Sequence, residues 1–333
     1  MGAKQSFPRE QIPQNRTFVV TGANRGIGYE IAKWIAMLGG TVVMACRSED
    51  ETMKAMRQMD QEYKEEKAKG TEGLVDVPEL SLVFMELDLS SFKSTKAFVQ
   101  AYKDSGRPLH VLICNAGISK AKPEQTEDGF EFMLQVNYLS HFLMIGQLLP
   151  MMKKNESETR IVLVSSDAHK MCGYNLEAIN YQGDPSNFGV LDYYGRSKLY
   201  QIMQMHCLHR RLRNSNISVT SAHPGMVETK IGAEFKDRTA YQLFLKMSRL
   251  VGVMRTPIQG ATTIINSAVN PDLKSVSGVY FKDCQPASTT SVSRDEVKQE
   301  ELWNKTLEFL KGHFTEEEIY CLEGADPTET LSD

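Results

Sequence analysis

Short apolar runs alternate along the chain with longer segments in which apolar residues recur at helical spacing. Seven runs have the composition of strands, at residues 17–21, 41–46, 82–87, 110–114, 160–164, 217–222 and 279–282. Several are apolar at consecutive positions, which is typical of strands buried on both faces of a parallel sheet. Helical spacing falls between them, at residues 29–38, 48–69, 91–103, 130–149 and 194–212. This alternation predicts an α/β fold: a single doubly wound, parallel, seven-stranded sheet with helices on both faces, as in a Rossmann fold.

The sequence shows no division into two domains. Gly and Pro are dispersed, and no low-complexity tract or repeat period is visible. One nucleotide-binding domain is therefore expected, with its extra length in substrate loops and at the ends. The predicted parts are an N-terminal extension at residues 1–14, the domain at 15–312 with substrate loops at about 167–193 and 226–256, and an acidic, solvated tail at 313–333.

Composition and charge exclude several classes of function. Lys and Arg number 38 against 42 Asp and Glu, a net charge of −4 without a block of like charges, so no nucleic-acid partner is expected. No apolar stretch reaches the roughly 20 residues of a membrane span, and the first residues lack the apolar core of a secretory signal. We therefore expect a cytoplasmic protein with free thiols. The six cysteines lack the short spacings of a zinc or redox pair, so no metal site is expected.

A glycine-rich turn follows the first predicted strand and leads directly into the first predicted helix. It reads Thr21-Gly22-Ala23-Asn24-Arg25-Gly26-Ile27-Gly28, so its glycines follow the pattern GxxxGxG. Glycine allows a sharp turn, lets backbone N–H groups approach a pyrophosphate, and lets the helix pack closely on the strand. At this position in a βαβ unit, the pattern predicts a dinucleotide site.

The end of the second predicted strand favours NADP(H) over NAD(H). NAD-preferring sites place an acid there to bind the ribose hydroxyls, whereas this chain has Cys46 followed by Arg47. Arg25 projects from the glycine turn, so two guanidinium groups can face a 2′-phosphate. The alternative is that Arg47 only occupies the solvent end of the sheet. We interpret the pair of arginines as part of an NADP(H) site.

Further motifs follow the later strands: Asn115-Ala116-Gly117, Ser165-Ser166 and Tyr194-Gly195-Arg196-Ser197-Lys198. Together with the glycine turn, they occur in the order and spacing of the short-chain dehydrogenase/reductases, which the chain resembles over residues 15–285. It is similar in particular to the retinol dehydrogenase and dehydrogenase/reductase branch, on the segments 45–47, 87–90, 136–142, 165–169 and 223–225. The resemblance implies an oxidoreductase that moves a hydride between a nicotinamide and a carbonyl or alcohol carbon.

Tyr194 is the predicted acid/base of that reaction. A phenol near its usual pKa of about 10 is a weak base at neutral pH and needs a neighbouring cation. Lys198 lies four residues later, on the same helix face, where its ammonium group is expected to lower the pKa of Tyr194. Tyr193 lacks such a partner, because the residue four beyond it is Ser197. Tyr193 is therefore assigned to the wall of the substrate pocket.

The resemblance implies roles for the other motif residues. Ser166 would hold the substrate oxygen beside Tyr194, and Asn137 would hold a water in a proton relay to Lys198. The alternative for Asn137 is a bond to a helix carbonyl. His169 is a candidate substrate contact, although a loop histidine without catalytic duty is the simpler interpretation. The predicted cofactor contacts are Gly22, Asn24, Arg25, Gly26, Ile27, Gly28, Arg47, Asp88, Leu89, Asn115, Ala116, Gly117, Tyr194, Lys198, Pro224, Gly225, Val227 and Thr229.

The expected substrate is a small apolar carbonyl or alcohol, such as a retinoid, a steroid or a long-chain aldehyde. An alternative from another class is a non-catalytic NADPH-binding adaptor with the same fold. The presence together of Asn137, Ser166, Tyr194 and Lys198 favours the enzyme.

The first residues bear on localisation. Most relatives in the retinol dehydrogenase branch carry a hydrophobic N-terminal anchor, which this sequence lacks. It begins MGAKQS, which matches the myristoylation pattern, so Gly2 is a candidate for peripheral attachment to membranes or lipid droplets. The resemblance also makes a homodimer a hypothesis.

Overall fold

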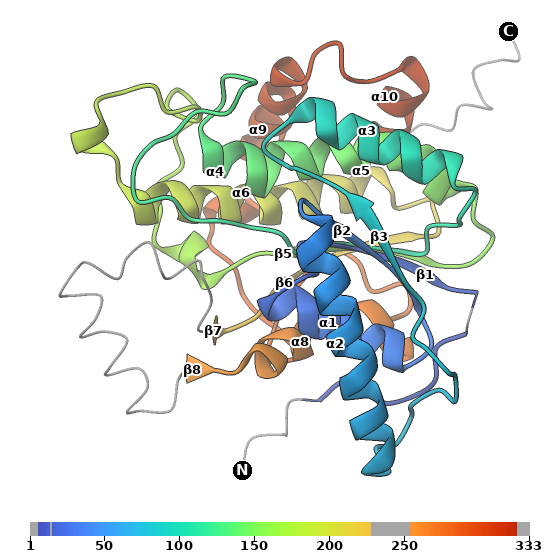
Figure 1. Ribbon diagram of the computed structural model, residues 1–333. Helices are drawn as coiled ribbons and strands as arrows, with labels where there is room; N and C mark the ends of the chain where they lie inside the picture. Colours follow the sequence, from blue (N-terminus) through green and yellow to red (C-terminus); the bar gives the residue numbers. More distant parts are fainter. Residues whose placement is uncertain (1–5, 14, 228–253, 325–333) are drawn as a thin grey trace, which may run out of the picture.

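The computed structural model of the protein describes residues 6–13, 15–227 and 254–324. Its centre is one large sheet (Figure 1), built from β1 (Thr17–Thr21), β2 (Thr41–Cys46), β3 (Leu82–Glu86), β4 (Val111–Cys114), β5 (Thr159–Val164), β6 (Ile217–His223), β9 (Val279–Lys282) and β10 (Gln285–Pro286). The strand order is β10-β9-β6-β5-β4-β1-β2-β3. Because β1 pairs in parallel with both β2 and β4, the loops that follow these strands meet at one edge of the sheet.

The seven predicted strands all lie in this sheet in parallel, which confirms the doubly wound α/β fold. The expectation of a wholly parallel, seven-stranded sheet is wrong at one edge, where β10 adds an eighth strand antiparallel to β9. The turn between them passes through Asp283 and Cys284, both with positive φ. A two-residue strand has no apolar run for a sequence pattern to detect. A separate small sheet pairs β7 (Met226–Val227) with β8 (Met254–Arg255).

Helices cover both faces of the large sheet (Figure 1). On one face lie α1 (Gly26–Met37), α2 (Glu49–Ala68) and α8 (Pro257–Val269), and on the other α3 (Phe92–Asp104), α5 (Ser140–Lys153) and α6 (Val190–Arg211). Because both faces are covered, adjacent residues of β1 lie in different hydrophobic cores. Val19 joins the core beneath α5 and α6, whereas Phe18 and Val20 join the core beneath α1 and α8. A strand between two cores must be apolar at consecutive positions, as this sequence is.

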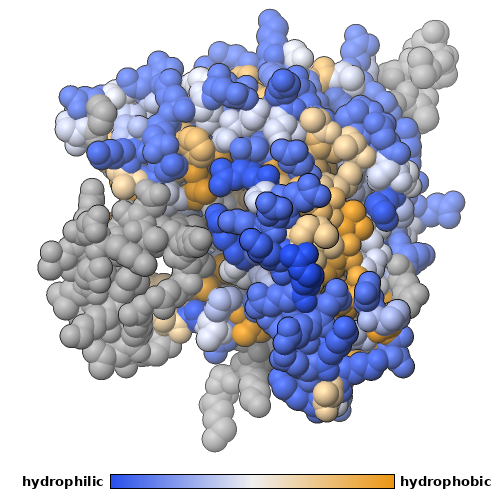
Figure 2. All heavy atoms as spheres, viewed as in Figure 1, coloured by the Kyte–Doolittle hydropathy of each residue, from blue (hydrophilic) through white to orange (hydrophobic). Residues whose placement is uncertain are grey.

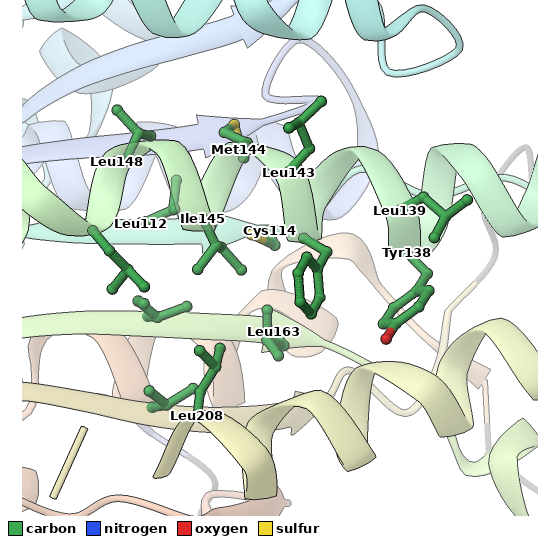
Figure 3. Close-up of a cluster of buried hydrophobic side chains, with 14 of the residues drawn as sticks. Leu112, Cys114, Tyr138, Leu139, Leu143, Met144, Ile145, Leu148, Leu163 and Leu208 are labelled. Carbon is green, nitrogen blue, oxygen red and sulfur yellow. The ribbon is translucent and has the colours of Figure 1, made fainter. Parts of the chain in front are cut away.

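The larger core lies between the sheet, α5 and α6 (Figure 3). Side chains of α5, such as Ile145, and of α6, such as Leu208, are directed toward Leu163 and the neighbouring strands in that view. All three are fully buried. Each such side chain stabilises the fold by about 2 kcal/mol relative to exposure. This packing fixes the carboxyl ends of β4 and β5, to which two of the sequence motifs belong.

The N-terminal extension packs on the domain from residue 6 onward. Phe7 is 8% exposed, and its ring lies 5.5 Å from the ring of Trp34 of α1. Ile12 is equally buried, and its N–H donates to Leu38 O at 2.7 Å. Gly2 lies outside the described residues, so its myristoylation stays a prediction.

Residues 313–324 are the part of the acidic tail that the structure describes, and there the expectation of a solvated surface is wrong in part: Glu316 and Glu317 are exposed, but Glu318 is buried. α9 (Glu296–Phe309) packs on α6, and α10 (Glu316–Leu322) packs on α5 with Cys321 and Leu322 buried. Glu318 is 5% exposed, because it closes the capping box of α10 with Thr315 and pairs with Lys103. Carboxylates in the first turn stabilise a helix N-terminus, so the acidic run is a helix signal that net charge conceals.

Hydrophilic side chains cover the outer face of α2, and apolar side chains gather beside it, toward the edge strand β3 (Figure 2). The outer face of α2 is thus solvated, as expected of a helix whose buried residues lie along one side. Within residues 6–227 and 254–324, apart from residue 14, no helix is sufficiently long and apolar to traverse a bilayer.

Candidate active site

The glycine turn lies at the carboxyl end of β1 and leads into the N-terminus of α1. Gly22 and Gly26 have φ values of +65° and +60°, which favour glycine. A Cβ at Gly28 would lie 2.2 Å from Gly22 O and 2.5 Å from Asn115 Nδ2, so only glycine fits. α1 has no side-chain cap and no acidic residue in its first turn, and the space where a Cβ on Gly26 would lie is open among the described atoms. Uncapped N–H groups beside open space fit a pyrophosphate.

Thr21 joins this turn to the motif that follows β4. Its Oγ1 accepts hydrogen bonds from the backbone N–H groups of Asn115 and Ala116, at 3.0 and 2.9 Å. Thr21 Oγ1 also lies 3.0 Å from His141 Nε2, and His141 Nδ1 lies 3.2 Å from Asn137 O. Because a carbonyl only accepts, Nδ1 carries the proton and Thr21 donates to Nε2. Burial lowers the pKa of His141 to about 4, so the imidazole that connects Thr21 with Asn137 is neutral at pH 7.

Arg25 and Arg47 lie in the loops that follow β1 and β2. Both side chains are exposed, and neither makes a hydrogen bond or ion pair with another residue that the structure describes. Cys46, at the end of β2, is 3% exposed, and burial raises the pKa of its thiol, so it is neutral. Asn24 Nδ2 lies 3.4 Å from Glu51 Oε2 in the first turn of α2. Two unpaired guanidinium groups are thus available to an anion.

Asn137 lies in a π-helical turn, η1 (Gln135–Leu139), between the short helix α4 (Phe132–Leu134) and α5. Such wide turns are frequent at functional sites. Its Oδ1 accepts from Ile118 N at 2.8 Å, and its Nδ2 donates to Ile118 O and to Ser197 Oγ, each at 3.0 Å. Asn137 therefore fixes the loop after β4 against α6 and does not bond a helix carbonyl through its side chain. The predicted water relay stays a prediction.

Ser166 and Tyr194 come together from the end of β5 and the first turns of α6. The Ser166 hydroxyl interacts with the phenol of Tyr194 closely enough to lower its pKa, and Ser166 Oγ accepts from Ala168 N at 3.2 Å. Ser165 is buried and donates to Lys198 O at 2.8 Å, which ties β5 to α6. Burial raises the pKa of Tyr194 to about 12, and the interaction with Ser166 opposes that shift. The phenol is therefore protonated at neutral pH.

Lys198 lies one turn beyond Tyr194, with Nζ 5.8 Å from the centre of the phenol ring. Nζ donates to Val164 O at 2.9 Å and to Gln201 Oε1 at 3.0 Å. Burial lowers the pKa of Lys198 to about 7. The sequence argument expects this cation to lower the pKa of Tyr194, but the shift has the opposite direction in the structure. Burial is the largest cause of this shift, and the neighbour that opposes it is Ser166, not Lys198.

His169 and Tyr193 take packing roles in the segment between Ser166 and α6. His169, in the short helix η2 (Asp167–Lys170), is 1% exposed, and its Nδ1 donates to Ser166 O at 2.6 Å. Tyr193 is 8% exposed, with its ring stacked on Phe188 at 4.8 Å and edge-on to Tyr181 at 5.1 Å. Loop spacing alone does not reveal these contacts. The predicted contact of His169 and Tyr193 with substrate stays a prediction.

Pro224 and Gly225 begin the loop after β6. Gly225 has a φ of +81°, and a Cβ there would lie 2.5 Å from Arg255 Cδ. Arg255 of β8 donates to Pro224 O at 3.4 Å and pairs with Asp283 of the β9–β10 turn. This arginine therefore holds the loop from a strand at the end of the second predicted substrate loop. The predicted cofactor contact Thr229 falls outside the described residues.

The other predicted cofactor residues belong to the same edge of the sheet. Ile27 and Val227 approach α8 closely, since a Cβ at Gly260 would lie 3.4 Å from Ile27 Cγ1 and 2.4 Å from Val227 Cγ2. After β3, Asp88 Oδ1 accepts from Ser90, and Leu89 O accepts from Ser140 Oγ of α5 at 2.7 Å. Their contacts with an adenine stay predictions.

Sequence motifs did not identify several polar residues that support this site. His141 follows Asn137 by four positions and Gln201 follows Lys198 by three, spacings that place each pair on one helix face. Those spacings could have identified both. Arg255 lies 31 residues from Pro224, so no local pattern links them. In the part of the chain that the structure describes, no group of three or more His, Cys, Asp or Glu side chains could hold a metal ion.

Comparisons with known proteins agree with this geometry. A family model described as short chain dehydrogenase matches residues 16–240. Retinol dehydrogenase 14 of Mus musculus is 36% identical over 309 residues, which cover 90% of this chain and 90% of that protein. Polyprenol dehydrogenase of Danio rerio is 31% identical over 91% of this chain and 89% of its own length. The solved structure of an uncharacterised protein from Mycobacterium paratuberculosis has a TM-score of 0.69 and 26% identity, covering 92% of this chain and 98% of that one.

Proposed function

This chain belongs to the short chain dehydrogenase family, and from that membership we propose that it is an NADP(H)-dependent oxidoreductase for an apolar carbonyl or alcohol, with Tyr194 as acid/base. The observation that carries the proposal is the convergence of three side chains: Ser166 acts on the pKa of Tyr194, and Lys198 Nζ lies one turn away, 5.8 Å from the centre of the phenol ring. A hydroxyl pair beside a buried cation suits proton transfer to a carbonyl oxygen.

The residues at the edge of the sheet fit a phosphorylated dinucleotide. The uncapped N–H groups of α1 would bind the pyrophosphate, and Gly28 leaves the turn room to approach Asn115. The unpaired side chains of Arg25 and Arg47 would bind the 2′-phosphate, which supports NADP(H) over NAD(H). When bound, the nicotinamide supplies the hydride donor or acceptor that no side chain provides.

The proton steps belong to Ser166, Tyr194 and Lys198. In the direction of reduction, Tyr194 donates its proton to the substrate oxygen, to which Ser166 also donates a hydrogen bond. The raised pKa of Tyr194, about 12, keeps the phenol protonated at neutral pH, as this direction requires. Charged Lys198 stabilises the tyrosinate that remains. In the direction of oxidation, that tyrosinate accepts the proton of the alcohol.

Two observations support an apolar substrate. The relatives named retinol dehydrogenase and polyprenol dehydrogenase share 36% and 31% of their aligned residues with this chain. The segment between Ser166 and Tyr194 contributes the aromatic cluster of Tyr181, Phe188 and Tyr193, against which Tyr194 packs. Retinoids, steroids and long-chain or prenyl aldehydes are the substrate classes that we propose.

A steady-state panel tests the proposal. The purified protein would be assayed with retinal, a steroid ketone and long-chain or prenyl aldehydes, each with NADPH and with NADH. We expect turnover of at least one of these compounds and a preference for NADPH of about tenfold or more, because a 2′-phosphate paired with arginine contributes charge-assisted hydrogen bonds. Tight NADPH binding without any turnover would point to the adaptor instead. A preference for NADH would contradict the roles of the two arginines.

A further inference from the structure

Two buried glutamines lie one turn apart on α6, and only one of them contacts the site. Gln201 is 0% exposed, and its Oε1 accepts from Lys198 Nζ at 3.0 Å. Gln204 is 2% exposed, and neither its Oε1 nor its Nε2 has a hydrogen-bond partner among the described residues. Gln201 Nε2 likewise lacks a partner among the described residues, so what distinguishes Gln201 from Gln204 is its oxygen, which accepts from Lys198 Nζ.

The bonds of the Lys198 ammonium group define what Gln201 does. An ammonium group has three N–H donors, and two of them go to Val164 O and Gln201 Oε1. One donor is therefore left without a protein acceptor in the described part of the chain. The group also lies against the loop after β4, because a Cβ at Gly117 would come within 3.3 Å of Nζ and 3.5 Å of Asn137 Oδ1.

We propose that Gln201 is a positioning residue for Lys198: with Val164 O it holds the ammonium group beside Tyr194 and leaves the third donor for the ligand. This inference rests on the proposed function only in the role that it gives to Tyr194 and Lys198. The hydrogen bond between Gln201 and Lys198 is observed in the structure and does not depend on the proposed function.

A neutral acceptor suits this position better than a carboxylate or an apolar side chain. Three titratable groups interact with Lys198 among the described residues: Cys114 of β4, His141 of α5 and Tyr194 of α6. All three are neutral at pH 7, because burial raises the pKa values of Cys114 and Tyr194 and lowers that of His141. The oxygens of Gln201 and Val164 are therefore what replaces water around the cation. A carboxylate would also cancel the charge that a tyrosinate needs.

The direct test is the titration of Lys198 by NMR, which requires neither substrate nor cofactor. The protein is labelled with ¹³C at the lysine Cε, and the signal of Lys198 is identified by its absence in Lys198→Arg. We expect titration near pH 7 in the wild type. In Gln201→Met the titration should move down by about one pH unit or more, and in Gln201→Glu it should move up by a similar amount. Gln204→Met, the same change one turn away, should leave it in place.

Shifts in opposite directions separate positioning from a merely structural role. If Gln201→Met and Gln201→Glu leave the Lys198 titration unchanged, or if Gln204→Met moves it equally, the inference is wrong. Should Gln201→Met fail to fold, Gln201→Asn withdraws the acceptor by one methylene and should give a smaller downward shift.

Activity gives a second readout. The pH dependence of kcat/KM for alcohol oxidation should show its ionisation at higher pH in both Gln201 variants, because both weaken the stabilisation of tyrosinate. Gln204→Met should keep the wild-type profile. A wild-type protein without turnover would refute the proposed function but leave the NMR titration as an independent test of Gln201.

Discussion

The two sides of the candidate site are built in different ways. On the cofactor side, backbone groups and buried polar side chains hold the loops, as when Thr21 Oγ1 accepts from two N–H groups of the loop after β4. On the substrate side, the segment 167–193 adds aromatic packing to its polar contacts, with Phe188 stacked on Tyr193 at 4.8 Å. The first arrangement accepts few residue types, whereas the second accepts many apolar ones. The cofactor side therefore carries more of the sequence motifs than the substrate side.

The largest effect should come from the residue on which the two sides meet. Tyr194→Phe removes the proton donor but keeps the ring that packs against the aromatic cluster. We expect turnover to fall by about 10²- to 10⁴-fold, which is the usual contribution of general acid–base catalysis. NADPH binding, measured by fluorescence titration, should stay within about twofold of the wild type. Undiminished turnover would remove Tyr194 from the mechanism.

The cofactor side should be intolerant of a single methyl group. In Gly28→Ala the new Cβ would lie 2.2 Å from Gly22 O, a backbone atom that cannot yield without moving the turn. We expect NADPH affinity to fall by about 100-fold, since a misplacement of about 1 Å has effects of that size. Gly173→Ala is the matched control, because neither Gly28 nor Gly173 has a positive φ and a Cβ at Gly173 would meet no described atom within 4 Å. Equal losses in both variants would mean that folding, and not the turn, is affected.

The choice between the two nicotinamide cofactors should depend on Arg47. Arg47→Ala removes one exposed, unpaired guanidinium group. The preference for NADPH over NADH should fall by about tenfold, because one charge-assisted hydrogen bond contributes about 1.5 kcal/mol. The KM for NADH should hardly change. A loss of affinity for both cofactors alike would show that Arg47 supports the sheet end instead.

The substrate side should tolerate substitutions better than the cofactor side does. Phe188→Ala removes the ring that stacks on Tyr193, and an aromatic pair contributes about 1 kcal/mol, so the KM for the carbonyl substrate should rise about fivefold. The affinity for NADPH should be unaffected. Met171→Ala changes an exposed residue of the same segment and should alter neither. An effect of Phe188→Ala on NADPH affinity as large as that of Gly28→Ala would abolish the contrast between the two sides.

The same contrast explains what could be predicted from the sequence. The strands were recognisable because burial on both faces requires consecutive apolar residues, and the cofactor loops because only glycine fits positions such as Gly28. β10 escaped because two residues carry no periodicity, and α10 escaped because its acidic first turn resembles solvated surface. In both cases a short segment is placed by contacts with distant parts of the chain.

Within the site, residue identity was easier to predict than electrostatics. The four-residue spacing of Tyr194 and Lys198 placed them together, but the direction of the pKa shift of Tyr194 depends on burial, which a motif does not report. His169 is another example. Its contact with Ser166 O is local, yet the burial that makes it a packing residue comes from the surrounding fold, including the ring of Tyr280 at 5.3 Å.

Transfer of deuterium from [4-²H]NADPH tests the central claim most directly, because it follows the hydride itself. The protein would be incubated with the labelled cofactor and the best carbonyl substrate of the panel, and the alcohol would be analysed by mass spectrometry. Our account predicts that the label from one face of the nicotinamide appears at the former carbonyl carbon, once per NADPH consumed, and that Tyr194→Phe suppresses its formation. Consumption of NADPH without deuterium in the alcohol, or labelled alcohol formed equally well by Tyr194→Phe, would contradict it.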